Sequence, residues 1–419
     1  MGEIKKSICY LCILCLLIMT GCSNQKGSDD SKETTTGIMD YIKMPSVSQS
    51  GVLTYYNSFL EFYDFETDQA VALCDKPNCM HNTRECNAYK DFIANVAFFY
   101  KDSLYYLSED SLNVMCLYKA DKNGMNERMI ISDIPVSRMS DAVLTKQGKL
   151  CFVAATYDIV EEEDDVFVEV QKGMSLVVID LNNNAYTIPF TTQDIANGRF
   201  LSSLNYCNDE VYAIVTHYNM DITGYNVDQG IEEDNEEYIG KENVDNLKEP
   251  PKNLKLIESY VRINSKDESE IIWSKQYESY FLYQGNELLT VHENELYCYN
   301  YKKGIFSINV TTGEEKTVLV TDENFVECID NEFILYDNSE SDKHTFKFFT
   351  LDGKECGSGE LDAPWIARID GSLSERYVFL MQNKEEPWFI KMGWCYKDDL
   401  KKGKTELHRM DFVDLEIKE

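Results

Sequence analysis

Short runs of alternating apolar and polar residues recur along most of the chain. A typical run is ENELYCYN (293–300), in which a tight polar turn leads into an aromatic-rich segment. Alternation with a period of two predicts β-strands, because successive side chains of a strand point to opposite faces of its sheet. No long stretch has the Ala, Leu, Glu and Lys content of a helix. The pattern therefore predicts an all-β protein.

Two turn signals divide these strands into repeats. One is a tight polar turn before an aromatic strand, as in KDSLYYL (101–107) and NDEVYAIV (208–215). The other is an Asp or Asn that ends an apolar run and precedes polar residues and another apolar run. It occurs seven times, at Asp64, Asp121, Asp180, Asn264, Asn309, Asp352 and Asp411. Asp and Asn suit such turns because their side chains bond the nearby main chain and they tolerate unusual backbone angles.

The spacing of the second signal predicts the architecture. The seven markers are 57, 59, 84, 45, 43 and 59 residues apart, and each interval holds about four short strands. Repeats of about 40–50 residues with four strands are typical of β-propeller blades. We therefore predict a β-propeller of seven blades, each of about four antiparallel strands, over residues 38–419. An irregular β-sandwich or two smaller β-domains is the alternative.

Two acidic segments interrupt the repeats. Residues 221–253 are acidic and include Pro250-Pro251, which predicts an insertion in the fourth blade and accounts for the longest spacing. A smaller acidic loop, Glu161–Asp165, interrupts the third blade. Neither has the ligand spacing of an EF-hand, so we expect both to be solvated.

The N-terminus carries an export signal. Lys5 and Lys6 precede an apolar run, Ile8–Met19, that is too short to be a stable membrane-spanning helix. The run ends in Thr20-Gly21-Cys22, which resembles the bacterial lipobox, where signal peptidase cuts before the cysteine.

The lipobox resemblance implies a lipid anchor. It predicts a lipoprotein signal peptide over residues 1–21 and lipidation of Cys22. Residues 22–37 are small and polar, which predicts a flexible tether. Such a protein would be held on the extracellular face of the cell membrane by its lipid chains. An ordinary signal peptide or a short uncleaved anchor is the alternative.

The charge balance excludes one class of partner. The chain has 73 acidic and 40 basic residues, a net charge of −33. Nucleic acid would repel it, because phosphate contacts need Lys and Arg. We expect the charge to serve solubility, while metal cations and cationic partners stay open.

The stretch LCDKPNCMHNTRECNAY (73–89), the cysteine loop, is the main candidate for chemistry. It contains one of only five histidines in the chain. Cys74, Cys79, His81 and Cys86 could supply the three thiolates and one imidazole of a structural zinc site. Two of the cysteines could instead form a disulfide, which an exported loop permits. The loop could also be inert, and nothing marks the oxyanion site that a reactive thiol would need.

The repeats, the lipobox and the cysteine loop together resemble a group of propeller lipoproteins from Gram-positive anaerobic bacteria, with TolB-like and WD-repeat-like architecture. Leu73–His81, with its Cys-x4-Cys-x-His spacing, and Cys86-Asn87-Ala88 carry the resemblance in the first blade. The WD dipeptide is absent, so a true WD-repeat protein is not implied. The resemblance implies a fold and a location but no activity.

No catalytic motif accompanies these features. The chain lacks a Gly-x-Ser-x-Gly elbow and a phosphate-binding glycine-rich loop, so no catalytic residue is predicted. We expect a surface-anchored lipoprotein whose non-catalytic propeller binds an extracellular ligand, such as an envelope protein, a peptide or a glycan, where loops surround the central channel. The alternatives are an extracellular glycan- or peptide-processing enzyme and a structural zinc-binding scaffold or sensor.

Overall fold

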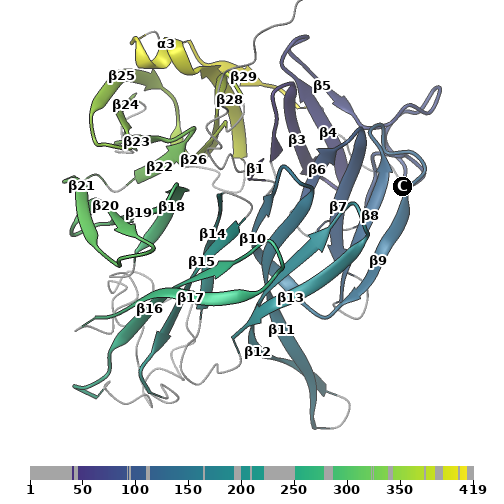
Figure 1. The fold of residues 1–419 in the computed structure, drawn as a ribbon. Helices are drawn as coiled ribbons and strands as arrows, with labels where there is room; N and C mark the ends of the chain where they lie inside the picture. Colours follow the sequence, from purple (N-terminus) through teal and green to yellow (C-terminus); the bar gives the residue numbers. More distant parts are fainter. Residues whose placement is uncertain are drawn as a thin grey trace, which may run out of the picture. The chain divides into compact units, whose positions relative to one another are not determined.

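Strands that follow one another in the chain pair antiparallel, and nearly every sheet is built from one continuous stretch (Figure 1). The chain divides into residues 1–35 and the unit Thr36–Glu419. The computed structural model describes residues 40–41, 46–91, 93, 96–109, 114–163, 166–192, 200–207, 210–220, 251–277, 286–321, 323, 325–337, 343–371, 374–382, 390–403 and 406–412. The predicted signal peptide (1–21), Cys22 and the tether (22–37) lie outside these residues. Within them, no helix is long and apolar enough to cross a membrane.

The described strands form seven sheets, which are the blades of a β-propeller. Blade 1 contains β2 (Ser46–Val47), β3 (Gly51–Tyr56), β4 (Phe59–Asp64) and β5 (Gln69–Ala72). Blade 2 contains β6 (Ala97–Tyr100), β7 (Ser103–Glu109), β8 (Met115–Asp121) and β9 (Arg128–Ile134). Blade 3 contains β10 (Ser137–Leu144), β11 (Lys149–Glu163), β12 (Val166–Asp180) and β13 (Ala185–Thr191). Blade 4 contains β14 (Phe200–Cys207), β15 (Glu210–Tyr218), β16 (Leu256–Ile263) and β17 (Ser269–Gln276).

The last three blades follow the same order. Blade 5 contains β18 (Glu287–His292), β19 (Glu295–Asn300), β20 (Gly304–Asn309) and β21 (Glu315–Leu319). Blade 6 contains β22 (Phe325–Ile329), β23 (Glu332–Tyr336), β24 (Lys343–Thr350) and β25 (Glu355–Asp362). Blade 7 contains β26 (Trp365–Asp370), β27 (Arg376–Gln382), β28 (Ile390–Tyr396), the short helix α3 (Lys397–Lys401) and β29 (His408–Met410). The predicted all-β propeller of seven four-stranded blades is confirmed.

The Asp and Asn markers work through a recurrent side-chain hydrogen bond. Four of the seven are the last residue of the third strand of a blade, and Asn264 and Asp352 follow such a strand by one and two residues. The Asp64 carboxylate accepts the N–H of the residue two positions on at 2.7 Å, and Asp180, Asn264 and Asn309 repeat this bond at 2.8–3.0 Å. Each bond turns the chain toward the fourth strand.

The seventh marker was wrong, although the blade that it stood for exists. Asp411 follows β29, the last strand of blade 7. β28 ends at Tyr396, without an Asp or Asn, and the connection to β29 contains α3. Asp411 therefore does not lie between the third and fourth strands of its blade, and the residues after Phe412 lie outside the described part.

Hydrophobic side chains close the ring at every junction between blades. Seven clusters of buried residues each join two neighbouring blades, including blade 7 to blade 1. Blades 7 and 1 share no strand, so Trp394 and Phe65, whose rings are 5.7 Å apart, belong to the packing that holds them together. The guanidinium of Arg376 lies 4.7 Å from the Phe65 ring and 4.8 Å from the Trp394 ring. Within the described residues, the ring is therefore closed by packing and not by a shared sheet.

Three local features differ from or refine the sequence expectations. β1 (Asp40–Tyr41) pairs with β10 and gives blade 3 a fifth strand, which no local pattern predicts. The insertion lies between β15 and β16, because Tyr218 pairs directly with Leu256; its residues 221–250 lie outside the described part. The acidic loop predicted at Glu161–Asp165 was partly wrong, since the first three residues extend β11 and Glu163 pairs with Val166.

Candidate functional site

The cysteine loop lies on the connection from the outer strand of blade 1 to the inner strand of blade 2. β5 ends at Ala72, and the loop returns to blade 1 at residues 88–90, where Leu60 N–H donates to the Ala88 carbonyl at 2.8 Å. The Phe59 and Tyr89 rings pack edge to face with centroids 5.6 Å apart. The segment therefore begins and ends against the same sheet, so residues distant in the loop meet at its base.

Four ligand-type side chains converge there. Donor atoms of Cys74, Cys79, His81 and Cys86, the Cys3His cluster, lie within 4.8 Å of one another. His81 Nδ1 is 3.4 Å from Cys86 Sγ, so this ring nitrogen faces the sulfurs. Cys86 is buried and the other three are half-buried. The structure brings together all four residues that the sequence singled out.

The protein environment acts differently on two of the thiols. Burial raises the pKa of Cys86 to about 12, and the neighbouring Cys74 and Cys79 add to the shift. Burial would also raise the pKa of Cys74, but hydrogen bonds from the backbone of Lys76 and Asn87 and from neighbouring thiols outweigh it, so this pKa is lowered.

The donor set of the Cys3His cluster can hold a metal ion. Three thiolates and one imidazole fill the four positions of a tetrahedral site, which is typical of structural zinc. A closed set of this kind leaves no position for a substrate. The sulfurs are also near enough for a disulfide to form after a modest movement, so the disulfide alternative stays a prediction.

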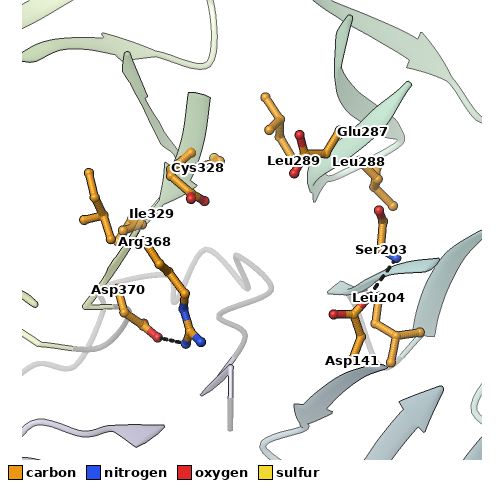
Figure 2. Close-up of a pocket in the computed structure, with 12 residues that line it drawn as sticks. Asp141, Ser203, Leu204, Glu287, Leu288, Leu289, Cys328, Ile329, Arg368 and Asp370 are labelled. Carbon is orange, nitrogen blue, oxygen red and sulfur yellow. Dashed lines mark hydrogen bonds and ion pairs between the residues drawn. The ribbon is translucent and has the colours of Figure 1, made fainter. Parts of the chain in front are cut away.

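A second site lies at the centre of the propeller. A cavity of about 240 Å³, the channel pocket, is walled by the inner strands of five blades (Figure 2). Its lining residues are Asp141 on β10, Ser203 and Leu204 on β14, Glu287, Leu288 and Leu289 on β18, Glu327, Cys328 and Ile329 on β22, and Arg368, Ile369 and Asp370 on β26. Four of the five blades contribute two or three adjacent residues because their innermost strands run along the pocket, whereas blade 3 contributes Asp141 alone.

The channel pocket is acidic. Its four carboxyls and one guanidinium give a formal charge of −3 when all the carboxyls are ionised. Arg368 forms an ion pair with Asp370, and the Ser203 backbone N–H donates to Asp141 at 3.1 Å; Figure 2 shows these pairs on opposite sides of the pocket. Glu287 and Glu327 remain as carboxyls with no ion pair among the described residues.

Burial and like charges shift these two carboxyls. Burial, followed by the charge of Glu287, raises the pKa of Glu327 to about 8, and Arg368 partly opposes the shift. Glu287 is exposed within the channel, yet the surrounding protein still desolvates its carboxyl. This desolvation, followed by the charge of Asp141, raises its pKa above the ordinary value. A pocket in which carboxylates repel one another gains stability when a cation or a proton enters it.

Irregular inner strands shape the pocket wall. Register shifts occur beside Asp141 in β10, across Ser203 in β14, beside Leu289 in β18 and beside Arg368 in β26. A bulge re-aims the side chains next to it. Ser203 also has a positive φ of 56°, which is uncommon for a residue other than glycine.

A buried network fixes the start of β18. Glu258 is fully buried and accepts the Asn286 backbone N–H at 2.7 Å and its side-chain amide at 2.6 Å. Burial raises the pKa of Glu258, whereas the Asn286 hydrogen bonds oppose the shift. Because Asn286 directly precedes Glu287, this network positions a carboxyl of the channel pocket.

The sequence did not single out the pocket residues. The sequence signal that could have indicated the pocket is a charged residue inside a short apolar strand, as at Glu327 in FVECI and Arg368 in WIARID. A charge in an inner strand faces either the channel or a neighbouring blade, and the sequence alone does not decide between them.

Comparisons with known proteins show the fold. No protein-family model and no curated protein matches the sequence. The structure is similar to a puromycin-hydrolyzing peptidase from Mycobacterium tuberculosis, with a TM-score of 0.50 and 9% identity over 91% of this chain and 55% of that chain. It is also similar to the β-propeller domain of the Trilobed protease from Pyrococcus furiosus, which has an open velcro topology (TM-score 0.47, 10% identity, 90% and 99% covered).

An oligogalacturonate lyase in complex with manganese is similar as well, with a TM-score of 0.44 and 12% identity over 75% of this chain and 74% of that chain. The chain spans about half the length of the mycobacterial peptidase. At 9% identity, the similarity to the mycobacterial peptidase is one of fold and assigns no activity.

Proposed function

We propose that this protein is a lipid-anchored, extracellular binding protein whose non-catalytic propeller takes a cationic group of its ligand into the channel pocket. The acidic lining of that pocket carries the proposal. The negative charges of Glu287 and Glu327 would repel each other when both carboxyls are ionised, which helps to raise the pKa of Glu327 to about 8. A positively charged ligand group favours the ionised forms and relieves that repulsion.

The ligand class follows from the lining. Ammonium and guanidinium groups match carboxylates in charge and hydrogen bonding. None of the residues that line the pocket is aromatic, so it offers no ring on which a sugar could stack. Among an envelope protein, a peptide and a glycan, a protein or peptide with an exposed Lys or Arg side chain fits best.

The pocket chemistry supports binding over catalysis. Cys328 is the thiol in the lining, and burial raises its pKa far above the ordinary value, so it is a poor nucleophile. Ser203 has no histidine beside it among the lining residues. A peptide- or glycan-processing activity is the alternative that this lining favours less.

A calorimetric titration tests the binding proposal. The probe is the blocked tripeptide acetyl-Ala-Lys-Ala-amide, and its comparator carries acetyl-lysine in place of lysine. We expect the charged probe to bind the wild type, and a Glu287→Gln/Glu327→Gln variant to bind it at least tenfold more weakly. Glu355→Gln, which removes an exposed carboxylate from β25, is the matched control and keeps wild-type affinity. Equal affinity for both peptides would refute the proposal.

Lipid anchoring is tested separately on intact bacterial cells. Metabolic labelling with a fatty acid should mark the wild type and place it in the membrane fraction. Cys22→Ala should lose both the label and the membrane association. A Cys22→Ala variant that still carries the label would rule out lipidation at this residue.

A structural zinc-binding scaffold is the second candidate function, and the Cys3His cluster favours it. We expect about one zinc per chain in protein purified without chelator, measured by mass spectrometry of the metals. Cys79→Ser and His81→Ala should lower the zinc content, whereas Cys356→Ser, at an exposed free cysteine, should not. Equal zinc content in all four proteins would eliminate the metal site.

A further inference from the structure

The cysteine loop has a small core that consists largely of its own cysteines: Cys86 and Ala88 are buried against Phe59, and Cys74 and Cys79 pack against them. None of residues 75–85 is buried, and Met80, the largest apolar side chain among them, is 76% exposed. Asn78 and His81 have positive φ angles of 59° and 52°, which add backbone strain. Ordering a residue costs about 1–2 kcal/mol of conformational entropy. The cluster around Cys86 offsets only part of that cost for residues 75–85, so a further interaction among the cysteines would add to the order of the segment.

The same loop forms part of the junction with blade 2. Asn123 Nδ2 donates to Asp75 Oδ2 from the β8–β9 turn (residues 122–127). Gly124, in that turn, packs so closely that a Cβ there would lie 2.6 Å from the Leu73 carbonyl oxygen and 3.0 Å from that of Asn87. The turn therefore packs against backbone carbonyls of the loop, and these contacts require the loop to keep one conformation.

Buried charge and apolar packing continue this junction on both sides of the Cys3His cluster. The buried Lys90 forms an ion pair with Glu127 of the β8–β9 turn and donates to the Asn87 carbonyl at 2.8 Å. Leu73 and Ile93, which flank the loop, belong to the hydrophobic cluster between blades 1 and 2. Disorder in the loop would therefore weaken the packing between blades 1 and 2.

We propose that a zinc ion bound by Cys74, Cys79, Cys86 and His81 Nδ1 is the clasp that joins blade 1 to blade 2. The inference rests on the zinc site of the second candidate function and assigns that site its task. Nδ1 is the nitrogen that faces the sulfurs, 3.4 Å from Cys86 Sγ. The metal adds to the small apolar cluster around Cys86 and holds the loop in the conformation that contacts the β8–β9 turn. Structural zinc sites contribute folding free energy directly, which suits them to this task.

Hydrogen–deuterium exchange of the full chain, with zinc and after chelation, tests the clasp. Removing zinc should raise exchange at least tenfold in residues 73–91 and in the β8–β9 turn, and adding zinc should restore protection. Residues 304–319 of blade 5 should not change. Cys79→Ser should reproduce the effect of the chelator, and Cys356→Ser should behave as wild type. If Cys79→Ser does not fold, the chelation arm on wild-type protein still decides the question.

The outcomes separate the clasp from the zinc site itself. If zinc binds but its removal raises exchange only within residues 75–85, the clasp is refuted and the metal site stands. If the purified protein neither contains nor takes up zinc, both the site and the clasp fail. Cobalt substitution provides a second readout, because tetrahedral cobalt–thiolate bands that change in His81→Ala would confirm the imidazole ligand, and unchanged bands would exclude it.

Discussion

The carboxyl of Glu327 should make the stability of the propeller depend on pH in an unusual direction. The charged groups that act on it are Glu287 on β18 and Arg368 and Asp370 on β26. Burial, followed by the charge of Glu287, raises its pKa from 4.5 to about 8. The native state then holds the proton more tightly than the unfolded chain does. This contribution to stability is complete below pH 4.5 and is lost as the pH rises through 8.

The magnitude follows from the size of the shift. A difference of one pKa unit corresponds to about 1.4 kcal/mol. The interval from 4.5 to about 8 therefore sets an upper limit of about 5 kcal/mol on the stability lost. Channel water around the half-buried side chain reduces this, so we expect about 2–5 kcal/mol. The glutamine of Glu327→Gln cannot ionise, so this variant should not lose that stability as the pH rises.

Urea unfolding of the ligand-free protein at pH 5, 6.5 and 8.5 measures the effect. The free energy of unfolding of Glu327→Gln should be close to that of the wild type at pH 5 and should exceed it increasingly toward pH 8.5. Glu355→Gln, which makes the same change on the exposed outer strand β25, controls for the loss of one negative charge from an acidic protein. A difference between Glu327→Gln and wild type that stays constant with pH, or shrinks toward pH 8.5, would refute the argument.

Three further substitutions probe how the blades are joined. Arg376→Ala removes a guanidinium that lies 4.7–4.9 Å from three rings at the junction of blades 7 and 1, and should lower the free energy of unfolding by about 2 kcal/mol; an unchanged urea midpoint would contradict this. Gly124→Ala should cost more than 1 kcal/mol and more than Gly403→Ala. Both positions have a positive φ, but only at Gly124 does the new Cβ meet backbone; equal costs would show that backbone strain alone matters. Asn205→Ala should cost about 2–4 kcal/mol by chemical denaturation. Its buried side-chain amide donates to the Leu289 carbonyl and accepts the Val291 N–H of β18, both at 3.2 Å. A cost below 1 kcal/mol would mean that water replaces these hydrogen bonds.

The two candidate sites differ in how far the sequence could predict them. The four residues of the Cys3His cluster lie within 13 positions of the chain, so their types and spacing alone suggest a shared ion. The channel pocket takes its residues from β10, β14, β18, β22 and β26, which span more than half of the chain. No local pattern links them, because they meet only when the inner strands are arranged around one axis.

The sequence by itself determined the features that depend on neighbouring residues. Alternation set the strands, and the Asp64-type hydrogen bond, made within two residues, set the turns and hence the blades. The error at Asp411 marks the limit of that argument, since the pattern occurs there after the fourth strand of the blade and not between the third and the fourth. Tertiary structure decided the rest: the pairing of β1 with β10, the closure of blade 7 on blade 1 by packing, and the acidic pocket. These depend on contacts between residues far apart in the chain, whose energies exist only once the ring is formed.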